Sequence, residues 1–410
     1  MAIKLNLSIL VIFLLSAFST NSMERTLTGY TTKECQTQSK ISVHCGKTPS
    51  STFDENNRMW VIFELNNFIY VNYSDDLGRS YSRPVAINSS PEEIYTNGEN
   101  RPKIIIGLHG ELFTSWTKKT SGKYTGDIRF SRSLDGGKTF SNIITINDDG
   151  LVTGHRFDSL TMAKDGTLYL SWIDKRDLKT KKFDGLKRQK STASIYYSYS
   201  KDAGTSFSKN QRLAESSCVC CRIAMTPITD HQVALLWRHV FDGGIRDHAY
   251  AVVKESKTVV PMQRATFDDW KIDACPHHGP ALLQDQNDVM HQVWFTASES
   301  YQGIFYARQS ANSNQWTNQI NVSNQPSASH PYILENDRQL MVVWKVFDGE
   351  KTKIMLQSSN DYGISWGHKK EISSTRGDSD HPFLLKQNRE SWLSWKTNDE
   401  GLRMIKLMFN

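Results

Sequence analysis

The segment Ser133-Leu-Asp135-Gly-Gly137-Lys-Thr139-Phe140 decides the fold, because its pattern recurs along the chain. The pattern Ser-x-Asp-x-Gly-x-(Ser/Thr)-aromatic returns at Ser74 to Tyr81, Ser200 to Phe207 and Ser359 to Trp366, and a degenerate copy with Asn312 in place of the aspartate runs from Ser310 to Trp316. Each copy follows a strand-like apolar run. The pattern predicts a tight hairpin turn, in which the aspartate accepts backbone N–H bonds, the glycine takes φ > 0 and the aromatic ring anchors the turn.

A second series of residues counts the repeats. Seven of the 11 tryptophans recur at intervals of 56, 56, 65, 57, 50 and 51 residues, at Trp60, Trp116, Trp172, Trp237, Trp294, Trp344 and Trp395. About 14 to 17 residues before each tryptophan a further element begins, at Cys45, Arg101, His155, Cys221, His278, His330 and His381. Seven copies predict an all-β propeller with seven blades of four antiparallel strands, six blades being the alternative.

The last repeat supplies only three strands before the chain stops. We therefore expect an N-terminal strand near Leu27 to Thr32 to complete this blade and close the ring, which removes a free sheet edge. No linker interrupts the repeats, so residues 23–410 are expected to form a single domain.

The first 22 residues have the pattern of a secretory signal peptide. Lys4 precedes the apolar run Leu5 to Phe18, and the small polar stretch Ser19 to Ser22 follows. No later stretch has about 20 uninterrupted apolar residues, so no membrane span is expected after signal cleavage. We expect a secreted or periplasmic protein, in which Cys35 and Cys45 close a short disulfide loop.

The repeated turns resemble the Asp boxes, or BNR repeats, of the sialidase superfamily. This resemblance implies a propeller fold over essentially all of the mature chain and a glycan-directed exo-glycoside hydrolase as the activity. Two features depart from the family. Sialidase catalytic domains have six blades, and their Arg-Ile-Pro element is replaced here by Cys45-Gly-Lys-Thr-Pro49. The box also occurs in propellers with other functions.

The strand order of a blade separates the boxes from the expected ligand face. The head of the innermost strand shares one face with the second-to-third loop, whereas the third-to-fourth turn, which carries the box, lies on the other. The inner-strand heads form a polar, cationic funnel, so the expected ligand is a glycan or small anion. The net charge of +6 owes much to the segment Lys175 to Lys190, which is interpreted as a solvated loop and not as a nucleic-acid site.

A sialidase-like reaction needs guanidinium groups for a sugar carboxylate, an acid/base carboxyl and a tyrosine nucleophile. The candidate arginines are Arg101, Arg156, Arg222 and Arg238. Asp158 or Asp127 is the candidate acid/base, and Tyr306 or Tyr124 the candidate nucleophile. Alternatively, the arginines tie blades together through backbone carbonyls.

The hub also carries residues that favour a metal site, and no cofactor other than copper or zinc is expected. Thiols and imidazoles suit these ions, and the candidate ligands are Cys218, Cys220, Cys221, Cys275, His277, His278, His155, His330 and His381. A disulfide between Cys275 and Cys218 or Cys220 is the competing interpretation of the cysteines. A non-catalytic module that binds a glycan or a protein is the third hypothesis for the whole chain.

Overall fold

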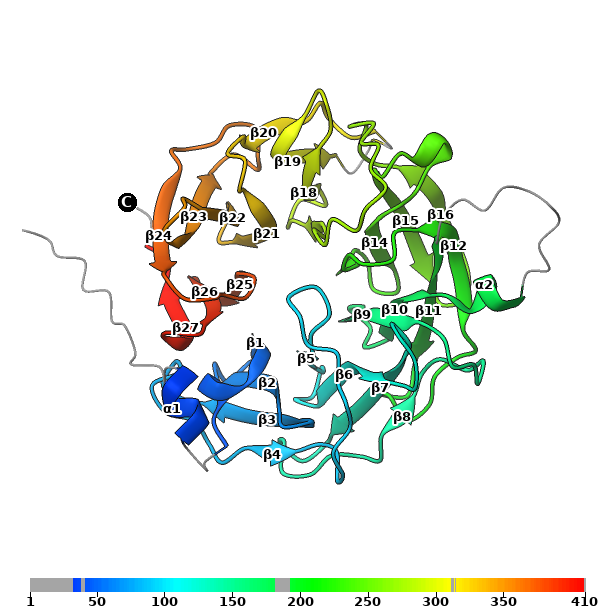
Figure 1. The fold of residues 1–410 in the computed structure, drawn as a ribbon, viewed down its shortest axis with the longest axis vertical. Helices are drawn as coiled ribbons and strands as arrows, with labels where there is room; N and C mark the ends of the chain where they lie inside the picture. The colour runs from blue at the N-terminus through cyan, green and yellow to red at the C-terminus, as the bar shows by residue number, and fades with distance from the viewer. Residues whose placement is uncertain (1–31, 38–40, 181–191, 311–312, 314, 409–410) are drawn as a thin grey trace, which may run out of the picture.

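The computed structural model describes residues 32–37, 41–180, 192–310, 313 and 315–408. Its strands form seven antiparallel sheets arranged as blades around a ring (Figure 1). The prediction of a seven-bladed all-β propeller is confirmed, and the alternative of six blades is wrong. None of the helices in these ranges has the length and apolar character of a bilayer-spanning segment.

Each blade runs outward from the hub in chain order. The first three blades are β1 (Lys47–Phe53), β2 (Met59–Leu65), β3 (Phe68–Ser74) and β4 (Val85–Ala86); β5 (Lys103–Ile106), β6 (Leu112–Lys119), β7 (Gly126–Ser133) and β8 (Ile144–Thr145); and β9 (His155–Met162), β10 (Leu168–Asp174), β11 (Ala193–Ser200) and β12 (Gln211–Ser217).

The remaining blades follow the same order. They are β13 (Ala224–Pro227), β14 (Val233–Arg238), β15 (His248–Lys254) and β16 (Lys257–Arg264); β17 (Ala281–Gln284), β18 (Met290–Ala297), β19 (Gln302–Gln309) and β20 (Ile320–Ser323); β21 (Ser329–Asn336), β22 (Gln339–Phe347), β23 (Thr352–Ser359) and β24 (Lys370–Thr375); and β25 (Phe383–Gln387), β26 (Glu390–Thr397) and β27 (Gly401–Lys406).

Short helical segments lie outside the blades. They are α1 (Thr32–Thr37), η1 (Val43–Cys45), α2 (Arg176–Thr180) and η2 (Asp242–Gly244). The predicted closing strand near Leu27 to Thr32 falls outside the described residues except for Thr32, which begins α1. Within the described residues the seventh sheet has three strands, and η1 packs against its last strand, where the backbone N–H of Leu402 donates to Nδ1 of His44. The predicted Cys35–Cys45 disulfide is present.

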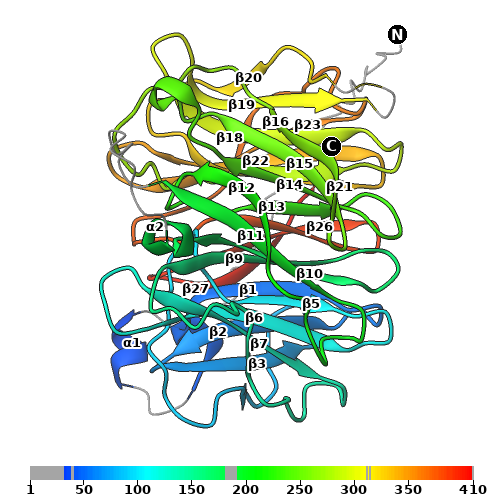
Figure 2. The same cartoon turned by 90° about the vertical axis from the view of Figure 1, so that its right-hand side faces the viewer.

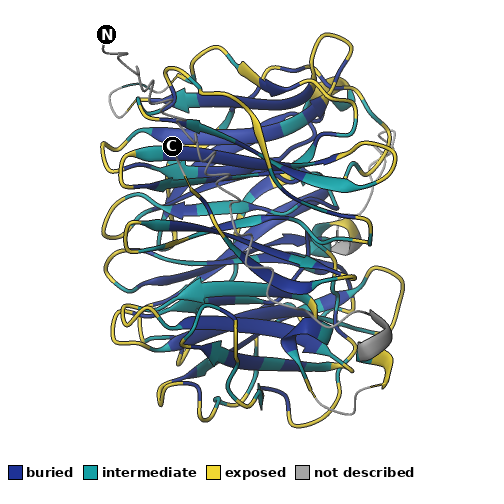
Figure 3. Cartoon of the chain, turned by 90° about the vertical axis from the view of Figure 1, so that its left-hand side faces the viewer, coloured by how far each residue is buried: buried dark blue, intermediate teal, exposed yellow. Residues whose placement is uncertain are grey.

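The core lies in the second strand of each blade, which neighbouring blades cover on both faces. All seven residues of β10 are buried, and six tryptophans on these strands rank among the largest fully buried side chains. Figure 3 shows the same distribution, with buried strands and exposed turns on both faces. In Figure 2 the blades lie side by side, so each one buries its faces against its neighbours.

Strand register shows that one tryptophan of the predicted series is out of phase. Leu112 pairs with Ser133 and Met59 pairs with Ser74, so Phe63 of β2 occupies the position that Trp116 has in β6. Trp60 lies three residues earlier, where its indole N–H donates to Asp54 at 2.9 Å. The number of tryptophans therefore predicts the correct number of blades. In the first blade, however, Phe63 and not Trp60 occupies the position of the buried tryptophan.

Each Asp box joins its own blade to the preceding one. In the second blade, Asp135 accepts hydrogen bonds from the backbone N–H groups of Lys138 and Thr139, as predicted from the sequence. Gly137 has φ +76°, and a Cβ there would lie 2.7 Å from the ring of Trp60 in the first blade. The box aromatics make the same inter-blade contact, because the ring of Trp366 lies 4.8 Å, centroid to centroid, from that of Tyr306.

The box glycine offers a matched test of this packing. Gly136 and Gly137 both have positive φ, but a Cβ at Gly136 would meet nothing within 4 Å. We expect Gly136→Ala to cost about 1 kcal/mol from backbone strain and Gly137→Ala about 2 to 4 kcal/mol, because the second variant also displaces Trp60. Urea unfolding of both variants measures the difference. Equal costs would contradict a packing role for the box glycine.

Candidate functional site

A long loop of the second blade occupies the centre of the ring. The segment 87–102 connects β4 to β5, and in Figure 1 it extends as a light-blue loop into the hub. Its buried Glu99 reaches the fourth and fifth blades, where Oε2 accepts from the backbone N–H groups of Arg222 and Gly279, both at 2.8 Å. Oε1 accepts from Nη1 of Arg222 at 2.6 Å. Glu99 thereby anchors the loop across the hub.

Three histidine rings from successive blades pack in a row beside this carboxylate. The ring centroids of His278 and His330 lie 4.4 Å apart, and those of His330 and His381 lie 3.5 Å apart. Nδ1 of His381 lies 3.4 Å from Oε1 of Glu99. One ring nitrogen of His330, one ring nitrogen of His381 and one carboxylate oxygen of Glu99 all lie within 4.8 Å of one another. We call Glu99, His278, His330 and His381 the hub cluster.

Burial sets the charge of the hub cluster. Burial alone would raise the pKa of Glu99, but the charge of Arg222 and a hydrogen bond from His381 hold it well below its usual value. Burial lowers the pKa of His278 to about 4 and also lowers the pKa of His330 and His381, the last against the opposing effect of Glu99. The cluster therefore contains a carboxylate and neutral imidazoles at neutral pH.

A cavity of about 360 Å³ lies beside the hub cluster, between the seventh and first blades. Gly98 and Asp380, the chain neighbours of Glu99 and His381, both line it. Lys47 and Lys396 line the same cavity. Its volume is at the lower end of the range for small-molecule sites, about 300 to 1,000 Å³.

Three of the four predicted catalytic arginines join blades together. Arg101 forms an ion pair with Asp380 and donates to the carbonyl of Pro49 at 3.0 Å. Arg222 holds Glu99 and donates to the carbonyls of Pro280 and Pro331. Arg238 is buried and donates to the carbonyls of Arg246, His278 and Phe295. This is the bridging arrangement that was the alternative to substrate binding.

Arg156 has a different environment. Its guanidinium carbon lies 4.4 Å from the ring centroid of Tyr95 and 5.4 Å from that of Tyr124, and Tyr124 is 53% exposed. Within the described part of the chain, no carboxylate forms an ion pair with Arg156. Arg156 is thus the predicted arginine that remains available for an anionic ligand.

The other two predicted catalytic residues lie in structural environments. Asp158 is buried between the second and third blades, where it accepts from Ser115 at 2.6 Å and pairs with Lys103 at 3.1 Å. Tyr306 is fully buried on β19, its hydroxyl 2.7 Å from Nδ1 of His291, and it packs against the box of the sixth blade. Burial raises the pKa of Tyr306, which disfavours the phenolate that a nucleophile requires.

His155 and His277 do not join the hub cluster. His155 is buried, with Nδ1 2.8 Å from the carbonyl of Gly126 and Nε2 3.1 Å from Asp149, so it braces the second and third blades. His277 is exposed, and its carbonyl accepts from Nε2 of His330 at 3.2 Å.

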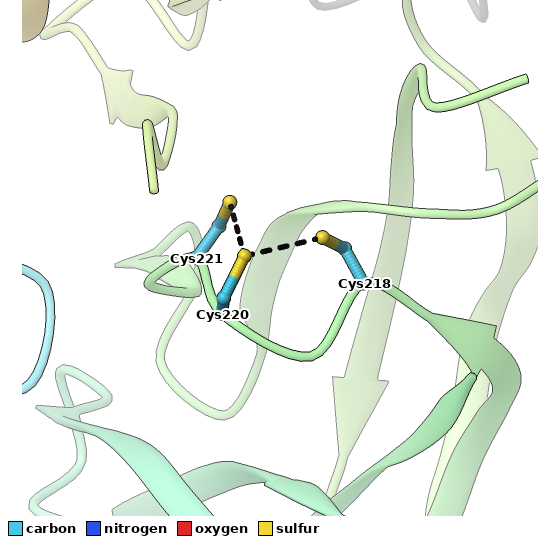
Figure 4. A group of neighbouring side chains, drawn as sticks. All are labelled: Cys218, Cys220 and Cys221. Carbon is cyan, nitrogen blue, oxygen red and sulfur yellow. Dashed lines mark hydrogen bonds between the residues drawn. The ribbon is translucent and has the colours of Figure 1, made fainter. Parts of the chain in front are cut away.

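The cysteines form a separate group between the third and fourth blades. Cys218, Cys220 and Cys221 are buried, and their sulfur atoms lie 3.6 Å (Cys218 to Cys220) and 3.8 Å (Cys220 to Cys221) apart (Figure 4). Cys275, in the segment before the fifth blade, is exposed and lies outside this group, whose three sulfur atoms are all within 4.8 Å of one another. All four are free thiols, so the predicted disulfide from Cys275 to Cys218 or Cys220 is not formed.

The expected meeting of thiols and imidazoles does not occur. In the described ranges, the three groups of potential ligands are the three thiols, Glu99 with His330 and His381, and His155 with Asp149 and Asp174, and none combines sulfur with imidazole. Two residues that contact the candidate site residues could not be predicted from the sequence. Tyr95 and Arg246 lie outside the repeat phase, and only the fold brings them to Arg156 and Cys218.

No model of a known protein family matches the sequence, and no curated protein is found similar to it. Solved structures of low identity share the fold. An ulvan lyase of polysaccharide lyase family PL25, bound to -[GlcA(1-4)Rha3S]-, has a TM-score of 0.54 at 12% identity, over 88% of this chain and 93% of the lyase. The polysaccharide lyase Uly1 has a TM-score of 0.53 at 8% identity, over 93% and 97%.

An α-L-arabinanase of Penicillium chrysogenum complexed with arabinobiose is also similar, with a TM-score of 0.52 at 16% identity, over 79% of this chain and 97% of the arabinanase. At these identities the likeness establishes the propeller fold.

The neutral histidines of the hub cluster predict acid sensitivity. In the unfolded chain His278 binds a proton near pH 6.5, whereas in the folded protein it does so only near pH 4. As pH falls, the unfolded state therefore binds a proton at His278 before the folded state does. The stability that neutral His278 contributes to the folded protein is lost as pH falls from about 6.5 toward 4. We expect His278→Gln to reduce the loss of unfolding free energy between pH 7 and pH 5 by about 1 kcal/mol, after allowance for partial exposure.

Urea unfolding at both pH values measures this effect. His109→Gln, which removes a solvent-exposed histidine, is the matched control. An unchanged pH dependence in His278→Gln would show that His278 is protonated in the folded protein at pH 5.

Proposed function

We propose that this chain is a glycan-directed enzyme whose reaction takes place at the hub face. The observation that carries the proposal is the contact between His381 and the buried Glu99, with the chain neighbours of both residues lining the adjacent cavity. The solved structures described above are propeller enzymes whose names refer to glycans, which supports the same class of substrate here.

His381 is suited to proton transfer. A carboxylate that contacts one imidazole nitrogen orients the ring and leaves the other nitrogen to accept a proton, as in other histidine bases. Burial keeps the pKa of His381 below its usual value, so the ring is neutral at neutral pH and has a nitrogen lone pair that can accept a proton. Glu99 is a positioning residue in this scheme, because Arg222 and Gly279 already occupy its oxygens.

Cations around the hub suit an acidic saccharide. Lys47 and Lys396 line the cavity, and Arg156 presents its guanidinium beside the exposed ring of Tyr124. A guanidinium binds carboxylate or sulfate groups well, and an exposed aromatic ring offers a surface for a sugar face. A polymeric glycan is long enough to contact both regions.

The finer hypothesis is an exo-glycoside hydrolase of the sialidase type. Its carboxylate recognition depends on Arg156, because Arg101, Arg222 and Arg238 make the inter-blade contacts described above. His381 takes the acid/base role in this scheme, since Asp158 and Tyr306 are enclosed by packing and by hydrogen bonds.

A substrate panel tests the proposal. Purified protein is incubated with sialosides, uronate-containing polysaccharides and arabinan, and both new reducing ends and unsaturated uronates are measured. We expect turnover of an anionic glycan and a fall in kcat of about 100-fold or more in His381→Gln. Lys138→Ala, in a box on the opposite face, is the matched control and retains wild-type activity. Equal activity in His381→Gln would refute the assignment, and absence of turnover would favour a binding module.

Substitution of Arg156 separates binding from chemistry. We expect Arg156→Met to raise KM for the anionic substrate about tenfold or more while kcat changes little, because this residue contacts the substrate charge and not the reacting bond. Steady-state kinetics with the substrate found in the panel measure both constants. A fall in kcat at constant KM would contradict this role.

A further inference from the structure

The three buried cysteines lie on a rigid connection between blades. The segment 218–223 connects β12 to β13, and the backbone N–H of Cys218 donates to the carbonyl of Arg238 at 3.0 Å. A bridge between Ser217 and His239 holds the start of the same segment. These contacts attach the start of the cysteine segment to β14 and the residue that follows it, in the fourth blade.

The simplest alternative is that these cysteines are small apolar core residues, and their contacts with hydrophobic side chains agree with it. Two observations go against it. A fourth thiol, that of Cys275, comes from a segment more than 50 residues away and interacts electrostatically with Cys220, although it lies outside the group of three sulfurs within 4.8 Å of one another. In addition, the buried guanidinium of Arg246 donates to the sulfur of Cys218 at 3.3 Å.

Arg246 is informative because it has no acidic partner. Its other side-chain hydrogen bond runs from Nε to the carbonyl of Ile272 at 2.7 Å, and no carboxylate in the described ranges pairs with it. A buried cation is costly unless an opposite charge accompanies it. Arg156 and Lys175 also lie close enough to Cys220 and Cys275 for electrostatic interaction. These cations suit sulfur that carries negative charge.

We propose that Cys218, Cys220 and Cys221 form a thiolate site for a soft metal ion, Cu(I) or Zn(II), with Cys275 as a fourth ligand at its exposed edge. Zn–S bonds of about 2.3 Å imply sulfur separations of about 3.8 to 4.0 Å, and the observed separations of 3.6 and 3.8 Å are close to this spacing. Thiolate ligands select these two ions over harder cations.

The charges of the site are consistent with binding. Coordination releases the thiol protons to solvent, so three thiolates with Cu(I), or four with Zn(II), carry a net charge of −2. Arg246 donates to Cys218, and Arg156 and Lys175 interact electrostatically with Cys220 and Cys275, so these three cations offset this charge. Cys275 is exposed, whereas the other three sulfurs are buried, so an ion enters from the side of Cys275.

Metal titration of the full chain tests the site. The protein is reduced, freed of metal and reductant without oxygen, and then titrated with Cu(I) or Zn(II) in competition with a chromogenic chelator. We expect one equivalent to bind with thiolate-to-metal charge-transfer absorption, and the affinity to fall about 100-fold or more in Cys220→Ser. Circular dichroism and thermal unfolding show whether the variants are folded.

Two further variants define the ligands. His330→Asn, in the hub cluster, is the matched control and retains the bound equivalent. Cys275→Ser distinguishes the ions, since four-coordinate Zn(II) is lost while three-coordinate Cu(I) is kept. If the wild type binds neither ion, or if folded Cys220→Ser binds as the wild type does, the thiolate site is refuted. Because glycan turnover is measured with His381→Gln, failure of one proposal leaves the other intact.

Discussion

The contact between a box glycine and the aromatic ring of the preceding blade is the constraint on which the rest of the structure depends. Gly137 lies against Trp60, and Gly363 lies against Tyr306, each in a conformation with positive φ. A side chain at either glycine would separate two blades, and the rotation between blades determines whether seven of them close into a ring. The boxes thus hold neighbouring blades together from the face opposite the inner-strand heads. The residues at the inner-strand heads can therefore differ from blade to blade.

At the hub, charged side chains hold neighbouring blades together. Arg101, Arg222 and Arg238 reach across blade boundaries to carbonyls, and Glu99 extends from the second blade to hold Arg222. Each guanidinium satisfies several acceptors, which suits the narrow centre of a propeller where backbone carbonyls of many blades converge. The residues that we propose for ligand contact are therefore few: His381, whose chain neighbour Asp380 lines the cavity, and Arg156 with its aromatic neighbours.

The fold was predictable from sequence because the same local pattern recurs in most blades and marks the same structural position each time. The spacing of Trp116, Trp172 and Trp344 marks one strand position, although Trp60 shows that a single member can lie out of phase while Phe63 takes its place. The site was less predictable. The repeat phase correctly placed His278, His330 and His381 at the hub, but a loop that does not repeat brings Glu99 to them. Whether an arginine faces a ligand or a carbonyl depends on neighbours remote in sequence.

The contact between η1 and β27 bears on how the ring is completed. His44 and Leu402 meet through one hydrogen bond although most of the chain lies between them, and the disulfide to Cys35 fixes the segment that carries His44. The two cysteines are separated by only 10 positions, so their bond constrains the chain locally, next to η1. The last blade packs against this covalently constrained segment. The seam of the ring therefore combines a disulfide on one side with noncovalent contacts across it.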